Sequence, residues 1–241
     1  MSPTHPTPGS PEKLAVRSMF DRIAPRYDLL NRLLSAGTDV RWRRACVDQL
    51  GLAPGSRVLD FCTGTADLLI EALRRNPGQR GVGIDLSEAM LARGADKLER
   101  RGLAEQGALL AGDAERLPLA SNAFDGAMVA FGIRNVGDAA AALREVHRVL
   151  RPGGRLVVLE FSMPPGLRGR AYRFYFTQLL PRIGGLVSGD RGAYSYLPAS
   201  VGKFPDPASF GEMIRVAGFG AVSWKPLTAG IAHLHRAEKE R

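Results

Sequence analysis

From Arg57 onward, short apolar runs alternate with longer stretches in which apolar and polar residues follow a helical period. The apolar runs are RVLDF (57–61), GVGI (81–84), ALLAG (108–112), DGAMVAF (125–131) and RLVVLEF (155–161). The helical stretches between them cover 66–75, 87–101 and 139–150. Strands that are apolar on both faces and separated by amphipathic helices indicate a parallel sheet covered on both sides. The pattern therefore predicts a doubly wound α/β core.

The chain before this core follows a different pattern. Between residues 13 and 50, apolar positions recur at helical spacing and are interrupted by Pro25, which predicts two or three short N-terminal helices. Residues 1–12 contain four prolines and few side chains that a core could bury. We therefore expect a disordered tail over 1–12, followed by the folded domain.

The chain after the fifth apolar run also breaks the alternation. Residues 163–205 are rich in Tyr, Phe, Arg, Pro and Gly and predict a helical insertion. A helix is expected at 206–219, and two strands at 221–227 and 230–239 follow it. Their tight connection predicts an antiparallel final pair, which would make seven strands in all. Such an ending does not fit a two-halved dinucleotide-binding fold, whose strands and helices would continue to alternate.

Composition limits the class of protein. A chain of 241 residues with 45% hydrophobic content can bury one substantial core, so we expect a single domain over 13–241. No run approaches the roughly 18 apolar residues of a membrane-spanning helix, and the N-terminus lacks the order of a secretory signal. The only cysteines, Cys46 and Cys62, have no metal-like spacing, and the four histidines do not form a metal-binding pattern. We expect a cytoplasmic protein without a metal site.

The charge balance points to phosphate-bearing partners without choosing among them. The chain has 33 basic and 24 acidic residues, which gives a net charge of +9 at pH 7. This charge attracts nucleic acid or anionic lipid over a long range. It is equally possible that the charge only keeps the protein soluble. The oligomeric state stays open, a homodimer included.

A ligand site is expected where the first strands end. In an open parallel sheet, ligands bind at the carboxyl ends of the strands. The loop 61–66 ends the first strand, and Gly64 is its only glycine, where a dinucleotide fingerprint would have three. Asp85 ends the second strand and can accept both hydroxyls of a ribose, while Asp113 follows the third strand, where it can accept an adenine amino group. Residues that could bind ribose and adenine, without a loop that could bind a pyrophosphate, suggest an adenosine ligand rather than a dinucleotide.

Four motifs in this order carry a family resemblance. The segments VLDFCTGTADLL, GIDLSEAML, GDAERLPLASNAFD and LREVHRVLRPGGRLVVLEFS resemble the successive motifs of class I S-adenosylmethionine-dependent methyltransferases. The resemblance implies a Rossmann-like seven-stranded sheet, S-adenosylmethionine as the cofactor, and a single glycine in the loop because a sulfonium has no phosphates to hold. The residues that it implies for cofactor binding are Asp60, Gly64, Thr65, Asp85, Asp113 and Ala114.

Three further segments resemble a narrower family. FDRIAPRYDLLNRLLSAGTDVRWRR from Phe20, FGIRNV from Phe131 and YSYLPASVGKFP from Tyr194 are similar to segments of the demethylmenaquinone and ubiquinone C-methyltransferase family, and the similarity covers residues 13–236. CTGTAD is closer to the menaquinone branch than to the AGGTGD of the ubiquinone branch. Two positions depart from the family: Asp39 stands where a histidine is usual, and Ala130 replaces a cofactor-contacting serine of the ubiquinone branch.

The narrower resemblance implies methyl transfer to a ring carbon of a prenylated quinol, most simply demethylmenaquinol. Such a carbon becomes nucleophilic once the neighbouring hydroxyl loses its proton. Arg134 is the candidate catalytic residue, because it could lower the pKa of that hydroxyl and orient a water that takes the proton. Its alternative role is a structural ion pair with Glu145 or Asp138. The candidate substrate-contacting residues are Tyr27, Asp28, Asn31, Asn135, Tyr194, Tyr196 and Ser200.

Other functions remain open from the sequence. The first alternative is the 2-methoxy-6-polyprenyl-1,4-benzoquinol methylase of ubiquinone biosynthesis. A nucleic-acid methyltransferase would share the core, but no NPPY or DPPY follows the fourth strand to grip a flipped base, so no nucleic-acid partner is expected. The missing glycines argue against an NAD-dependent oxidoreductase. A noncatalytic binding module would not need a full set of cofactor motifs.

The insertion also predicts transient contact with an anionic membrane surface. In LRGRAYRFYFTQLLPRIGGLV, four arginines alternate with aromatic and aliphatic residues. The arginines are Arg168, Arg170, Arg173 and Arg182, and the apolar residues are Tyr172, Phe174, Tyr175, Phe176 and Leu179. Such a segment binds an interface by apolar burial and attraction to headgroups, and it would take up the prenyl chain. Its alternative is a helix packed on the sheet with arginines in water.

Overall fold

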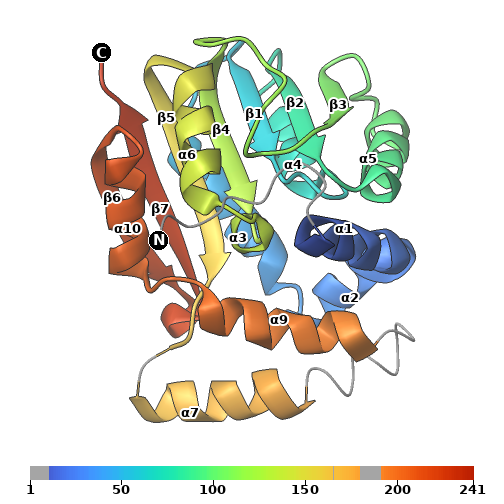
Figure 1. The fold of residues 1–241 in the computed structure, drawn as a ribbon. Helices are drawn as coiled ribbons and strands as arrows, with labels where there is room; N and C mark the ends of the chain where they lie inside the picture. The colour runs from blue at the N-terminus through green and yellow to red at the C-terminus, as the bar shows by residue number, and fades with distance from the viewer. Residues whose placement is uncertain (1–10, 165, 180–190) are drawn as a thin grey trace.

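A mixed seven-stranded sheet forms the centre of the computed structural model, which describes residues 11–164, 166–179 and 191–241 (Figure 1). The strands are β1 (Arg57–Phe61), β2 (Arg80–Asp85), β3 (Gly107–Ala111), β4 (Phe124–Ala130), β5 (Leu150–Phe161), β6 (Phe219–Leu227) and β7 (Ala232–Lys239). Their order is β3-β2-β1-β4-β5-β7-β6. The first five pair in parallel, and β7 is antiparallel to both β5 and β6. This confirms the predicted doubly wound sheet with an antiparallel end.

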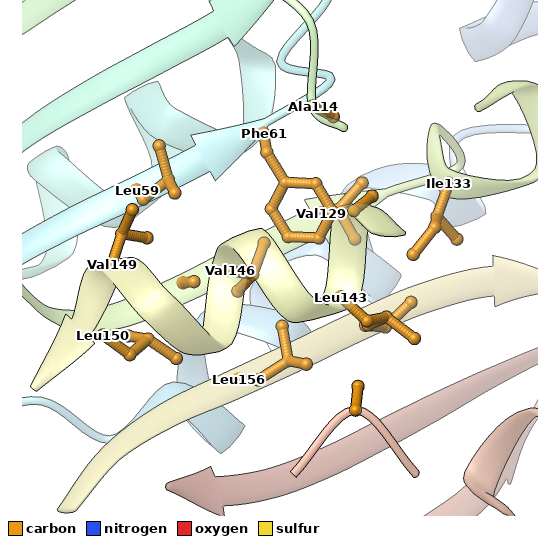
Figure 2. Close-up of a cluster of buried hydrophobic side chains, with 14 of the residues drawn as sticks. Leu59, Phe61, Ala114, Val129, Ile133, Leu143, Val146, Val149, Leu150 and Leu156 are labelled. Atoms are coloured by element: carbon orange, nitrogen blue, oxygen red, sulfur yellow. The ribbon is translucent and has the colours of Figure 1, made fainter. Parts of the chain in front are cut away.

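Helices cover both faces of the sheet, and each face has its own hydrophobic core. They are α3 (Thr38–Leu50), α4 (Asp67–Arg75), α5 (Glu88–Arg100), α6 (Ala139–Val149) and α10 (Pro207–Val216). Figure 2 shows the core beneath α6, where Leu143 and Val146 pack with Leu59 and Phe61 of β1. Val58, which points to the opposite face, packs with α3 and α4. Alternate residues of β1 therefore serve different cores, which explains why the strand reads as apolar throughout.

A third layer closes one end of the sheet. It consists of α1 (Pro11–Ile23), the 3-10 helix η1 (Ala24–Arg26), α2 (Tyr27–Leu34), α7 (Gly166–Phe174), the π-helix η3 (Tyr175–Leu179) and α9 (Arg191–Lys203). Met19, Ile23, Phe176 and Val201 share a small core, so the N-terminal helices and the insertion pack together. Figure 1 shows the layer below the sheet, where β5 ends.

The described part of the N-terminal segment is helical from its first residue. Helix α1 begins at Pro11, so two residues assigned to the tail lie in its first turn, while the rest of the predicted tail (1–10) lies outside the described residues. Pro25 lies in η1 and separates α1 from α2, as its missing N–H predicts. The insertion is helical over 166–179 and 191–203 among the residues that the structure describes. Within those same residues, no helix has both the length and the apolar composition needed to cross a bilayer.

Candidate active site

The loop after β1 holds an unusual backbone. Cys62, Gly64 and Ala66 have φ values of 54°, 55° and 62°, so two of these three left-handed residues carry a side chain. A Cβ added to Gly64 would meet no atom within 4 Å, which leaves open space beside its backbone. Gly132 faces the same loop, where a Cβ would lie 2.5 Å from Cβ of Cys62. The loop thus combines one open backbone position with one very close approach.

Asp85 links this loop to the end of β2. Its Oδ2 accepts the backbone N–H of Gly64 at 2.8 Å, and its Oδ1 accepts that of Ser87 at 2.9 Å. Burial raises the pKa of Asp85, and the backbone hydrogen bonds oppose this rise. Each oxygen keeps a lone pair, so the fixed carboxylate can still accept two ligand hydroxyls.

Asp113, after β3, is held from two sides. Its Oδ1 accepts the N–H of Glu115, and its Oδ2 accepts Nζ of Lys13 at 2.7 Å. Lys13 also pairs with Glu115 at 2.7 Å and is 7% exposed. Ala114 is buried beside them. The N-terminal helix therefore contacts the strand-end carboxylates, a contact that the sequence analysis did not find.

Asp60 is a buried carboxylate with one unused oxygen. Its Oδ2 accepts the hydroxyl of Thr63 at 2.6 Å and the N–H of Leu69 at 3.1 Å. Its Oδ1 is buried without a hydrogen-bond partner among the described residues. Burial raises the pKa of Asp60 to about 7, although both hydrogen bonds lower it.

Asp60→Asn should remove a pH dependence of stability in the cofactor-free protein. Because the folded pKa of Asp60, about 7, lies above its ordinary 3.8, its contribution to stability is complete below about pH 4 and is lost as the pH rises through 7. The loss should be roughly 4 kcal/mol at most, since one pKa unit corresponds to about 1.4 kcal/mol. Urea denaturation of both proteins from about pH 4 to pH 8 measures it. Parallel stability curves for the two proteins would contradict this assignment.

Two neighbouring cavities lie at this end of the sheet. The first, called here the loop cavity, has a volume of about 110 Å³. All six predicted cofactor residues line it: Asp60, Gly64, Thr65, Asp85, Asp113 and Ala114. Ala130, the position that differs from the ubiquinone branch, also lines it. The structure therefore brings together residues that lie up to 54 positions apart in the sequence.

The second, called here the aromatic cavity, is larger, at about 390 Å³ by the same measure. Its aromatic lining is Phe20, Tyr27, Trp42, Phe131, Phe161, Tyr172, Tyr175, Phe176 and Tyr196. Phe131 and Phe161 stack with ring centroids 4.2 Å apart, and Trp42 packs against both. Phe20, Tyr27, Asn31, Arg43 and Phe131 line both cavities. The two cavities therefore share a wall.

Arg134 lies in the 3-10 helix η2 (Ile133–Asn135) just after β4 and lines the aromatic cavity. Its Nη1 donates to Oε1 of Glu160 at 2.7 Å and to the carbonyl of Phe131, and its Nε donates to Oγ of Ser200 at 3.3 Å. Nη2 donates no hydrogen bond to any described residue. The guanidinium is thus held through Nε and Nη1, while its Nη2 donors stay available.

The predicted ion-pair partners of Arg134 were wrong. Its partner is Glu160 on β5, and both side chains are almost fully buried, at 6% and 2% exposure. Glu145 instead pairs with Arg148, and the side chain of Asp138 caps α6 through the N–H of Ala141. The single glutamate inside the apolar run VVLEF was a usable signal, because a charge in a buried strand requires a cation.

The candidate substrate residues lie in different places. Tyr27, Asn31 and Tyr196 line the aromatic cavity. Asn135 lines the loop cavity instead, with Oδ1 buried and without a partner among the described residues. Ser200 lines neither cavity and bonds Arg134. The side chain of Tyr194 lies outside the described part of the chain.

Asp28 also lines neither cavity, which corrects its predicted role. Its carboxylate accepts the hydroxyl of Thr65 at 2.6 Å and Nζ of Lys97 at 2.9 Å. Tyr27 and Asn31 are four residues apart and share one face of α2, whereas Asp28 is rotated by about 100° from that face. Lys97 also pairs with Asp67, which pairs with Arg43. Asp28 thus ties the N-terminal helices to the loop after β1.

The position of the family's usual histidine is also an ion-pair site. Asp39 is 4% exposed, accepts the hydroxyl of Ser35 at 2.8 Å and pairs with Arg43. An aspartate therefore supplies a fixed negative charge where an imidazole would be titratable. Nδ1 of His233 bonds the hydroxyl of Ser162, and Nε2 of His235 donates to the carbonyl of Pro207. Neither histidine lines either cavity.

Comparison with known proteins decides the family. The model of the ubiE/COQ5 methyltransferase family matches residues 9–239. The chain belongs to this family. This UbiE/COQ5 methyltransferase uses S-adenosylmethionine as its methyl donor, as the four sequence motifs predicted. The oxidoreductase and the noncatalytic module are thereby set aside.

Relatives of this UbiE/COQ5 methyltransferase cover almost its whole length. A demethylmenaquinone methyltransferase from Thermus thermophilus is 51% identical over 223 residues, which are 92% of this chain and 100% of that protein. A ubiquinone/menaquinone biosynthesis C-methyltransferase UbiE from Cereibacter sphaeroides is 43% identical over 225 residues, with coverages of 93% and 90%. Among solved structures, the [4+2]-cyclase SpnF has a TM-score of 0.73 at 21% identity, covering 95% of this chain and 97% of that one. That likeness shows the fold alone.

Proposed function

We propose that this UbiE/COQ5 methyltransferase transfers a methyl group from S-adenosylmethionine to a ring carbon of a prenylated quinol, and that the quinol is demethylmenaquinol. The observation that carries the proposal is the wall shared by the two cavities. On one side lie strand-end carboxylates, and on the other lies an aromatic cavity lined by Arg134. The name of the Thermus thermophilus relative, demethylmenaquinone methyltransferase, supports this choice of quinol.

The residues of the loop cavity fit the cofactor. Asp85 has both oxygens fixed by backbone N–H groups, as recognition of a ribose diol requires, and Gly64 leaves space beside its backbone. Asp85 would hold the ribose, Asp113 and Ala114 the adenine, and Asp60, Gly64 and Thr65 the amino-acid end. The unpartnered Oδ1 of Asp60 suits an ammonium group. When bound, the cofactor supplies an electrophilic methyl group.

The chain's own residues prepare the quinol. Aromatic walls such as Phe131 and Phe161 stack on a planar ring and exclude water from it. The Nη2 donors of Arg134 stabilise negative charge on the quinol oxygen, which lowers the pKa of the hydroxyl and raises electron density in the ring. Burial raises the pKa values of Tyr27 and Tyr196, so both stay protonated and act as hydrogen-bond donors.

Labelled methyl transfer tests the proposal directly. The protein is incubated in detergent with labelled S-adenosylmethionine and either demethylmenaquinol or 2-methoxy-6-polyprenyl-1,4-benzoquinol, with tRNA as a control acceptor. We expect label in the naphthoquinol. Preferential labelling of the benzoquinol would support the ubiquinone reaction, which the names of several relatives include. Label in tRNA alone would refute both quinol reactions.

The insertion supports a further proposal, that α7 contacts an anionic membrane surface. Arg170 and Arg173 are exposed, and Phe174 is 60% exposed between cavity-lining residues of the same segment. Only part of the predicted segment faces outward, because Phe176 is 1% exposed. The side chains of Arg168 and Leu179, and all of Arg182, lie outside the described residues.

Helix α2 also carries exposed apolar side chains. Leu29 and Leu33 are 63% and 54% exposed and lie one turn apart. Helices α2 and α7 both line the aromatic cavity, through Asn31 and Tyr172. Both of these cavity-lining helices therefore also carry exposed apolar side chains, through which an interface could deliver the prenyl chain.

The variant Arg170→Gln/Arg173→Gln should sediment less with anionic liposomes at low salt. Each lost basic contact near the surface removes roughly 1 kcal/mol, so binding should weaken by about 10- to 30-fold. The charge-matched control is Arg74→Gln/Arg144→Gln, two exposed arginines on α4 and α6. Activity on a short-chain, water-soluble quinol should persist in both. Equal loss of sedimentation in the control would mean that only net charge matters.

A further inference from the structure

Glu160 is a buried acid beside the aromatic cavity with no role in the sequence analysis. We propose that Glu160 is a positioning residue, which fixes the guanidinium of Arg134 and offsets its charge, and so sets the pH at which a quinol hydroxyl beside Arg134 ionises. The proposal rests on the proposed function, because it concerns the hydroxyl of the same substrate.

The geometry of Glu160 fixes Arg134 at two points. Its Oε1 accepts Nη1 of Arg134 at 2.7 Å and the N–H of Phe161 at 2.8 Å. Its Oε2 accepts the backbone N–H of Arg134 at 3.4 Å, so the acid holds both the side chain and the turn that carries it. Glu160 is itself 2% exposed and belongs to a central strand. A carboxylate on so rigid an element orients its partner closely.

The contacts of Arg134 leave one nitrogen for a ligand. Three of its five N–H bonds are engaged, by Glu160, the Phe131 carbonyl and Ser200. The two remaining N–H bonds, both on Nη2, have no acceptor among the described residues. The guanidinium carbon also lies over the ring of Phe161, 5.5 Å from its centroid, in a cation–π contact. These contacts hold the guanidinium, and Nη2 is the donor left for the quinol oxygen.

The charges near this pair are few. Tyr196 and Tyr27 interact with Arg134, and Cys62 interacts with Glu160, and burial raises the pKa values of all three, which keeps them neutral near pH 7. Asp39 and Arg43, which line the same cavity, pair with each other. Asp60, Asp85 and Asp113 of the loop cavity are the other acids that act on Cys62 or Tyr27. Arg134 and Glu160 pair directly, and their formal charges cancel.

Removing either charge of the pair should shift the pKa of the quinol hydroxyl in a definite direction. A cation near the hydroxyl favours its anion and lowers its pKa, and a nearby carboxylate opposes that effect. Glu160→Gln keeps the size and one acceptor oxygen but removes the opposing charge. The hydroxyl should then ionise at lower pH than in the wild type, whereas Arg134→Met should make it ionise at higher pH.

The test follows the ionisation of a bound 1-naphthol by its absorbance, in the whole protein without cofactor. We expect the apparent pKa of the bound naphthol to fall by about one unit in Glu160→Gln and to rise in Arg134→Met. The acid limb of the pH–kcat profile should shift in the same directions. The matched control is Glu238→Gln, which neutralises the partly exposed partner of Arg155 and should shift neither.

The outcomes distinguish failure of the proposed function from failure of the role of Glu160. If the wild type binds no naphthol and methylates no quinol, the proposed function fails and the role of Glu160 fails with it. If the wild type binds and methylates but Glu160→Gln titrates as the wild type does, only the role of Glu160 is overturned. Should Glu160→Gln not fold, the double variant Arg134→Met/Glu160→Gln removes both charges of the pair. Its naphthol pKa should then lie between those of Arg134→Met and the wild type, and a value below the wild type overturns the proposal.

Discussion

Arg134→Ala should lower the kcat of methyl transfer by about 100-fold or more, while the affinity for S-adenosylmethionine changes little. The reason is the location of Arg134, which lines the aromatic cavity and not the loop cavity. Its loss removes the donors that would stabilise charge on the quinol oxygen and leaves the cofactor contacts in place. Steady-state kinetics at saturating quinol, with calorimetry for the cofactor, measures the two effects separately.

The buried ion pair makes a control necessary. Removing Arg134 alone leaves Glu160 buried without its cation, which can cost about 3–5 kcal/mol of stability. The double variant Arg134→Met/Glu160→Gln removes both charges and should recover much of that stability without recovering turnover. If this double variant turns over quinol at a near-normal rate, Arg134 is only the structural partner of Glu160.

Asp85→Ala should weaken the binding of S-adenosylmethionine by roughly 1.5 to 3 kcal/mol, the range for loss of charge-assisted hydrogen bonds. The carboxylate would accept the ribose hydroxyls, and its backbone contacts also hold Gly64 and Ser87 in place. Asp85 ends a strand and faces a cavity rather than a core, so the variant should stay folded. Isothermal calorimetry gives the affinity.

A surface control separates this effect from a general change in charge. Asp48→Ala removes a carboxylate that is 55% exposed and pairs with Arg75, so cofactor affinity should not change. An unchanged affinity in Asp85→Ala would instead reject the ribose assignment. A lowered melting temperature accompanied by unchanged affinity would mean that Asp85 serves only to hold the loop.

The sequence was most informative where local pattern and topology coincide. The run VLDF is apolar on both faces because α6 covers one side of β1 and α3 with α4 covers the other. Parallel strands bring their carboxyl ends to one edge, so Asp60, Asp85 and Asp113 could be assigned to one site before their distances were known. The structure places all three around the loop cavity.

The sequence was least informative where a side chain finds its partner across the fold. Lys13 pairs with Asp113, 100 positions away in the sequence. Arg134 pairs with Glu160, 26 positions away, although Glu145 is nearer in the sequence. The rotation of a short helix decides such contacts, as at Asp28, and hydrophobic periodicity does not determine it to within one residue. The aromatic cavity is likewise assembled from helices and strand ends whose separate patterns indicate only burial.

The close approach of Gly132 to Cys62 makes two distant positions interdependent in evolution. One of the two backbones must come without a side chain, because a Cβ at 132 would lie 2.5 Å from Cβ of Cys62. The glycine that the first loop lacks at 62 thus has its counterpart after the adjacent strand β4. A glycine at 62 would remove the shortest of these contacts and ease a change at 132, whereas a cysteine at 62 requires glycine at 132.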